Sequence, residues 1–213
     1  MKRVPGAGGR RRPSQRRSQL TVTAILDAAA RVFEERGFDA GTTNHVAARA
    51  GVSIGSLYEY FPNKDAMVVA VVERELERER SKLLAILEPA ATERGLAAQL
   101  RAFVETLVEL HGRRPALHRI LFDQAEHPPA AHACMLAYEE SLAHALAESL
   151  RSVRPSLRDP DTKAHLIVQT TESLAHRFVL RGIHDLTRAD FVRELTRLLI
   201  GYVGGGRDPR ASE

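Results

Sequence analysis

Two short helical segments joined by a glycine-containing turn constrain this chain more than any other feature. Residues 42–64 read TTNHVAARAGVSIGSLYEYFPNK. Thr42 or Thr43 is a suitable N-cap for a helix of about eight residues, because its side chain can accept from a free backbone N–H. Gly51 ends that helix, since glycine readily takes the left-handed conformation. Ser53 then caps a second short helix, so the segment predicts a helix-turn-helix.

The apolar residues of this segment predict how it packs. Its inward-facing set is Val46, Ala47, Ala50, Val52, Leu57 and Phe61. An earlier helix that ends near Gly37 offers the surface they pack on, because its apolar residues repeat at helical spacing. Those residues are Val22, Ile25, Leu26, Ala29, Val32 and Phe33. We therefore predict a three-helix module over 18–64, with its third helix free to enter a DNA major groove.

The outward-facing residues of the module predict what it would contact on DNA. Ile54, Gly55 and Ser56 begin the third helix, where recognition helices meet base edges. The neighbouring hydroxyls and the Lys64 ammonium suit phosphate oxygens, which position a protein without reading sequence. The candidate DNA-binding residues are Thr42, Thr43, Asn44, Ser53, Ile54, Gly55, Ser56, Tyr58, Tyr60 and Lys64.

Residues 22–64 also carry a familiar pattern of apolar, glycine and hydroxyl positions. The pattern consists of Ile25, Leu26, Ala28, Ala29, Phe33, Gly37, Thr42, Thr43, Val46, Ala47, Ala50, Gly51, Val52, Ser53, Gly55, Leu57, Tyr58, Tyr60, Phe61 and Lys64. It resembles the DNA-binding domain of the tetracycline-repressor (TetR) family. The resemblance implies an all-α homodimer, a four-helix bundle formed by the last two long helices of each subunit, and repression released by a ligand. Asn44 departs from members that place a longer base-contacting side chain there.

The rest of the chain is predicted to be helical, because no segment shows the alternation of apolar and polar residues that is typical of strands. Further helices are expected at about 64–87, 94–111, 115–125, 129–152, 160–181 and 188–203. The predicted fold class is therefore all-α, with about nine helices and a flexible tail over 204–213. From the resemblance, residues 65–203 are expected to form a regulatory and dimerisation domain. Two apolar stripes are expected to form the dimer interface: Leu166, Ile167, Thr170, Leu174 and Phe178, with Phe191, Leu195, Leu198, Leu199 and Tyr202.

Positive charge is concentrated at the N-terminus. Residues 1–17 hold seven basic residues and no acidic one, whereas the rest of the chain has a net charge of −3. Such a segment buries too little apolar surface to offset its ordering entropy, so we expect a disordered arm. The arm either contacts DNA or only aids solubility, and its charge alone does not decide between these.

The expected partners are double-stranded DNA, a second copy of the chain and an unidentified small-molecule effector. The candidate ligand-binding residues are His111, His118, Phe122, Cys134, Tyr138, Gln169, Glu172 and His176. No cofactor and no metal are expected, because the histidines do not follow the spacing of a metal site. The alternative is a helix-turn-helix regulator without a ligand. A cavity of about 300 Å³ or more would favour the sensor.

One motif suggests an enzyme instead. Residues 51–55 match G-x-S-x-G, which would make Ser53 an esterase nucleophile, with Asp161 or Asp185 and then His176 or His184 as partners. That elbow requires a strand before the serine, whereas a helix is expected there, so we predict no enzymatic activity.

Location is indicated by what the chain contains. A single cysteine, Cys134, excludes an internal disulfide. No apolar run approaches the roughly 20 residues that span a bilayer. The expected location is the cytoplasm, with no membrane partner.

Overall fold

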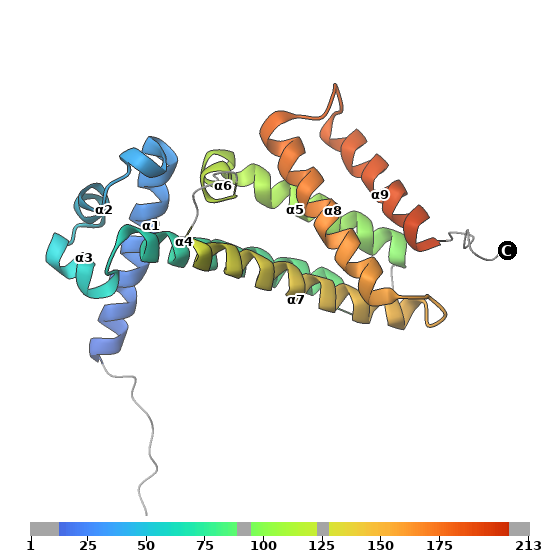
Figure 1. Ribbon diagram of the computed structural model, residues 1–213, viewed down its shortest axis with the longest axis horizontal. Coiled ribbons are helices and arrows are strands. Elements are labelled where there is room, and N and C mark those ends of the chain that lie inside the picture. The colour runs from blue at the N-terminus through green and yellow to red at the C-terminus, as the bar shows by residue number, and fades with distance from the viewer. Residues whose placement is uncertain (1–12, 89–94, 123–127, 205–213) are drawn as a thin grey trace, which may run out of the picture. The chain divides into compact units, whose positions relative to one another are not determined.

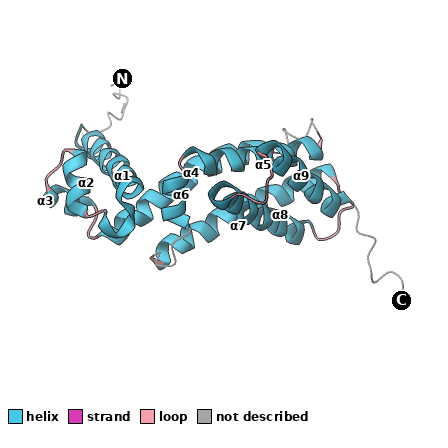
Figure 2. Cartoon of the chain, turned by 90° about the horizontal axis from the view of Figure 1, so that it is seen from above, coloured by secondary structure: helices cyan, strands magenta, loops and turns pink. Residues whose placement is uncertain are grey.

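The computed structural model describes residues 13–88, 95–122 and 128–204, and these segments contain helices and no strand (Figure 2). The chain divides into two compact units, Met1–Val71 and Val72–Glu213. None of the helices in the described segments combines the length and apolar character needed to cross a membrane.

The helices, in chain order, are α1 (Pro13–Ala40), α2 (Thr43–Ala50), α3 (Ile54–Tyr60), α4 (Lys64–Leu87), α5 (Leu96–Arg113), α6 (Pro115–Phe122), α7 (Pro129–Val153), α8 (Pro160–Arg181) and α9 (Arg188–Gly204) (Figure 1). The all-α prediction with about nine helices is confirmed for the part of the chain described. The expected α4 and α8 match at both ends. The α5 helix is shifted by two residues, and residues 123–125 of the expected α6 lie outside the described segments.

Local capping chemistry shapes the first unit as predicted. The Thr42 hydroxyl accepts from the backbone N–H of His45 at 3.3 Å and caps α2. Gly51 ends that helix in the left-handed conformation, with φ of 69°. The Ser53 hydroxyl accepts from the backbone N–H of Ser56 at 3.0 Å and caps α3. The α2 helix packs on α1 and on α3, and the side chains of Val46 and Leu57 are fully buried.

The start and end of α1 differ from expectation. Residues 13–17 are helical, so the prediction of a disordered arm over 1–17 is wrong for these five residues; residues 1–12 lie outside the described segments. The glycines and prolines of the arm are confined to positions 5–13, and proline is compatible with the first turn of a helix. Gly37 leaves the helical conformation as predicted, with φ of 77°, but helix resumes beyond it to Ala40.

The second unit is built on helix pairs. The α7 helix packs along α8, and α5 packs against both α8 and α9 (Figure 1). A buried polar link joins α7, α5 and α4 at one point. The Ser149 hydroxyl donates to the Gln99 side-chain oxygen at 2.8 Å, and the Gln99 amide donates to the carbonyl of Ile86 at 3.0 Å. Buried polar groups that are paired in this way cost little stability.

The two apolar stripes expected at the dimer interface are divided by the fold. Four of their residues, Ile167, Phe191, Leu195 and Leu199, are buried within the protomer, so they can add little area to an interface, and the interface itself stays a prediction. The reason is that α5 already covers one side of both helices. Three others stay exposed: Leu166 at 46%, Leu198 at 58% and Tyr202 at 37%.

Candidate DNA-reading surface and effector cavity

The predicted DNA-binding residues lie on α2 and α3 or at their ends, except Lys64, which begins α4. Ser53 and Gly55 are exposed, as are Ile54 at 39% and Tyr58 at 47%. No atom lies closer than 3.8 Å to the position that a Cβ on Gly55 would take. The start of α3 therefore presents a small, open surface, which suits close approach to base edges.

Two tyrosine hydroxyls of this surface have partners inside the unit. The Tyr58 hydroxyl lies 3.1 Å from the Thr43 hydroxyl and links α3 to α2. The Tyr60 hydroxyl accepts from the Ser18 hydroxyl at 3.3 Å and links α3 to α1. Both tyrosines thus hold the helices in position, besides offering oxygens to a phosphate.

Lys64 has an intramolecular role that the sequence did not suggest. Its ammonium donates to the Phe38 carbonyl and lies 3.9 Å from the centre of the Phe38 ring. Burial lowers the pKa of Lys64. A cation over an aromatic face is stabilising, so this residue anchors the end of α1. Its predicted contact with phosphate competes with that role.

A second tie between helices also escaped the sequence reasoning. The Arg49 guanidinium donates to both carboxylate oxygens of Glu35, at 2.5 and 2.6 Å. The pair joins α2 to α1 and is largely exposed, so its contribution to stability is small. No sequence pattern indicates it, since the two residues lie on different helices.

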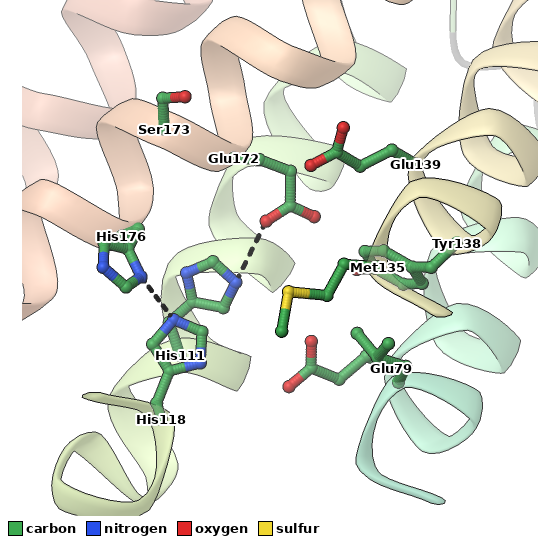
Figure 3. Close-up of a pocket in the computed structure, with 10 residues that line it drawn as sticks. Glu79, His111, His118, Met135, Tyr138, Glu139, Glu172, Ser173 and His176 are labelled. Carbon is green, nitrogen blue, oxygen red and sulfur yellow. Dashed lines mark hydrogen bonds and ion pairs between the residues drawn. The ribbon is translucent and has the colours of Figure 1, made fainter. Parts of the chain in front are cut away.

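The second unit contains a cavity of about 230 Å³ (Figure 3). Its lining comes from α4, α5, α6, α7 and α8: Leu76, Glu79, His111, His118, Met135, Tyr138, Glu139, Glu172, Ser173 and His176. The volume is below the roughly 300 Å³ expected for a sensor. A groove of about 600 Å³ adjoins it and shares Glu79 and His118.

Five of the eight predicted ligand-binding residues line this cavity: His111, His118, Tyr138, Glu172 and His176. Cys134 instead lines an adjoining hollow that shares Leu76 and Tyr138 with the cavity, and Gln169 is exposed. The side chain of Phe122 lies outside what the structure describes.

The sequence reasoning missed the other five lining residues, Leu76, Glu79, Met135, Glu139 and Ser173. The last three adjoin predicted residues on the same helices. Glu79 could not be recognised because it lies in an alternating charge run that reads as a solvated helix face.

The histidines and Glu172 form a connected cluster. His111, which is 2% exposed, lies with its Nε2 3.2 Å from the Glu172 carboxylate. Its ring stacks on His118, with centres 4.0 Å apart. His118 in turn shares a 2.9 Å hydrogen bond between its Nε2 and Nδ1 of His176, in which either ring can donate (Figure 3).

Burial and neighbouring charges shift the titration of this cluster. Burial, together with the charges of Glu172 and Glu75, raises the pKa of Glu79 to about 7. Burial lowers the pKa of His118 to about 2, so this imidazole is neutral. Burial also disfavours the cationic form of His111, but the hydrogen bond and charge of Glu172 outweigh it and raise its pKa. Burial raises the pKa of Tyr138 well above its ordinary value, so the phenol keeps its proton.

Three buried polar atoms of the lining have no hydrogen-bond partner among the described residues. They are Nδ1 of His111, the hydroxyl of Tyr138 and Oε1 of Glu172. Buried polar atoms in proteins are almost always paired, so these three are open to a partner. Among the side chains described, no group of three or more histidine, cysteine or acidic residues is arranged to hold a metal ion.

An exposed third helix in a capped three-helix unit, followed by a helical domain with a cavity, defines a helix-turn-helix transcriptional regulator. Residues 25–71 match the model of bacterial regulatory proteins of the tetR family, and residues 95–202 match the tetracyclin repressor-like C-terminal domain. The chain therefore belongs to the TetR family, as its resemblance implied.

Individual relatives agree with this assignment. An uncharacterized HTH-type transcriptional regulator of Mycobacterium tuberculosis is 32% identical over 76% of this chain and 77% of its own length. A putative TetR-family regulator from Mesorhizobium loti has the same fold, with a TM-score of 0.71, 16% identity and coverage of 87% of this chain and 98% of its own. FadR from Bacillus subtilis, in complex with stearoyl-CoA, has a TM-score of 0.62 at 20% identity, with coverage of 87% and 99%.

The esterase alternative has no geometric support. Ser53 follows helix α2, and residues 43–60 contain no strand to form a nucleophile elbow. The Ser53 hydroxyl instead donates to the Ser56 hydroxyl at 3.0 Å. The family matches point to a regulator and not to an enzyme.

Proposed function

We propose that this TetR-family protein is a homodimeric repressor of a palindromic DNA operator and that a small-molecule effector in the cavity releases it. The observation that carries the proposal is the cavity itself. It contains three buried polar atoms without a hydrogen-bond partner of good geometry among the described residues, and leaving such atoms unpaired is costly unless something else binds them. These atoms favour an effector over the alternative of a regulator without one, although the cavity volume is below the roughly 300 Å³ that would favour a sensor by itself. The cytoplasmic location expected from the sequence stays a prediction.

On the DNA-reading surface formed by α2 and α3, different residues would contact bases and phosphates. Ile54, Gly55 and Ser56 would face base edges, while the hydroxyls near them would hold phosphates. A dimer would need its two third helices about 34–36 Å apart to enter successive major grooves. The exposed position of Ile54 and Tyr58 supports this assignment.

The dimer interface would use the exposed remainder of the predicted stripes. Leu166, Leu198 and Tyr202 lie around one hollow of α8 and α9, of about 290 Å³. Covering three exposed apolar side chains is favourable because it removes apolar surface from water. An obligate interface should bury upwards of about 2,000 Å², so residues beyond these three must take part.

Release would be a shift between dimer conformations. An effector weakens DNA binding only as far as it prefers the conformation that does not fit DNA. The α4 helix is the expected lever, because Lys64 at its start anchors α1 while Glu79 lines the cavity.

The size of the cavity limits the effector. About 230 Å³ is less than typical drug sites offer, so an effector as large as the stearoyl-CoA held by FadR would not fit inside it. We expect a smaller molecule.

The test begins with the operator. Duplexes that bind the full chain are selected from a random pool, and the protein is then titrated with selected and scrambled duplexes. A selected palindrome with clear preference over the scrambled duplex is expected, and small molecules are then screened for release. Binding of both duplexes with equal affinity would contradict the proposed function.

A further inference from the structure

The charges that line the cavity are unbalanced. Three carboxylates, those of Glu79, Glu139 and Glu172, face it, whereas none of the described residues in its lining is a lysine or an arginine. His118 is neutral, whereas the hydrogen bond and charge of Glu172 favour the cationic form of His111. Figure 3 shows Glu79 and Glu172 directed toward the same space from α4 and α8, with Met135 of α7 between them.

The residues around Glu79 do not provide enough positive charge to offset the burial of its carboxylate. His111 and Lys82 favour its ionised form, while burial, Glu172 and Glu75 oppose it, and the opposing effects prevail. Glu139 is affected similarly: burial and Glu172 raise its pKa despite His132 and Gln169. Two lining carboxylates are therefore held in sites that disfavour their charge.

Hydrogen-bonding capacity in the cavity points the same way. Glu172 uses Oε2 for His111, and its buried Oε1 has no hydrogen-bond partner of good geometry among the described residues. The hydroxyl of Tyr138, whose side chain is 6% exposed, has no such partner there either, but it lies near enough to Glu172 for hydrogen bonding to contribute and near enough to Glu79 for its charge to act on it. An alkylammonium group has three donors and no acceptor, so it matches acceptor oxygens gathered in one place.

We propose that the cavity binds a small organic cation, with its ammonium or amidinium group held by the carboxylates of Glu79 and Glu172. The inference rests on the proposed sensor function and names its ligand class. Leu76 and Met135 supply apolar surface for the hydrocarbon part of the ligand. At interior packing density the volume admits roughly ten non-hydrogen atoms.

The charges of the adjoining groove suit an anion better than those of the cavity do. In the cavity an anion would face three carboxylates. The adjoining groove has the opposite balance, with Arg78, Lys82, Arg113 and Arg114 against Glu75 and Glu79. Arg78 pairs with Glu75 at 2.9 Å, and Arg113 pairs with Glu109 at 2.8 Å. Charge thus distinguishes the inner cavity from the groove beside it.

The experiment compares three probes that share a chain and differ in charge: hexylammonium, hexan-1-ol and hexanoate. Binding to the full chain, without DNA, is measured by calorimetry and by competition against hexylammonium. Hexylammonium is expected to bind at least roughly tenfold more tightly than the other two, as charge-assisted hydrogen bonds are the strong ones. Glu172→Gln and Glu79→Gln should each weaken its binding by a similar factor and weaken the binding of hexan-1-ol much less, because a hydroxyl makes only a neutral hydrogen bond to the same position.

The matched control is Glu105→Gln, which changes an exposed carboxylate of α5 that pairs with Arg101 away from the cavity. It should leave all three affinities unchanged. The inference is overturned if hexylammonium fails to bind at millimolar concentration, if hexanoate competes with it at equal affinity, or if both glutamine variants bind it like the wild type. Because no DNA is present, these outcomes concern only the ligand class, and operator selectivity tests the proposed function separately.

Discussion

Replacing Glu79 by glutamine should make the protein more stable at alkaline pH. Glu79 has a pKa of about 7 in the folded protein, against 4.5 for the ordinary group. Between these values the folded state binds more protons than the unfolded state, so stability falls as pH rises from about 4.5 to 7. Glutamine keeps the shape of the side chain but cannot ionise, which removes this loss.

The magnitude follows from the size of the shift. One pKa unit corresponds to about 1.4 kcal/mol, so ionised Glu79 costs at most about 3 kcal/mol above pH 7. The substitution also removes the favourable charges of His111 and Lys82 on the carboxylate, which reduces the net gain. We expect Glu79→Gln to gain about 1 to 3 kcal/mol relative to the wild type at pH 8, and no such gain at pH 5.

The assay is urea unfolding of both proteins at pH 5 and pH 8. Protein concentration is held constant, because the stability of a dimer depends on it. Titration of the remaining histidines affects both proteins and largely cancels in the difference. A stability difference that does not grow between pH 5 and pH 8 would refute the account of Glu79 as a carboxylate lacking a counter-charge.

Four further predictions concern the reading surface, its anchor, the arm and the dimer. Gly55→Ala should change which duplex is preferred, since a Cβ there would make only an ordinary 3.8 Å contact with the Ser53 hydroxyl, whereas Tyr58→Phe should weaken all duplexes about equally; affinities for specific and random DNA distinguish the two. Lys64→Ala should lower the unfolding temperature besides weakening DNA binding, because the ammonium anchors Phe38, and an unchanged melting curve would argue against that anchor. Deleting residues 1–12, which keeps α1 intact, should reduce the salt dependence of affinity by about 0.9 for each phosphate that the arm neutralises, and an equal slope for both proteins would leave only a solubilising role. Leu198→Glu should yield monomers in light scattering at micromolar concentration, because it places a charge at the centre of the proposed interface; a persistent dimer would exclude this face.

The helices and the reading unit were accessible from the sequence because their causes are local. Thr42, Gly51 and Ser53 act on backbone groups two to four residues away, so their presence predicts where α2 ends and α3 begins. The apolar spacing of α1 likewise predicts which face is buried, and Ile25 and Phe33 are fully buried as expected.

Other features depended on which distant residues the fold brings together. Ile167 and Leu166 are neighbours on one apolar stripe of α8. The side of α8 that carries Ile167 is covered by α5, whereas Leu166 stays exposed. From the sequence alone, Lys64 is predicted to donate to a phosphate. In the fold, the ring of Phe38 on another helix lies beneath its ammonium.

The cavity shows most clearly which features the sequence predicts and which depend on the tertiary structure. Five of its residues were anticipated as polar groups suited to a ligand, but Glu79 was hidden in a charge run that by itself predicts only a solvated face. Capping and periodicity depend on a few consecutive residues, so the sequence alone predicts them. The pKa of Glu79 depends on burial and on charges contributed by α5 and α8, and only the tertiary structure decides where those lie.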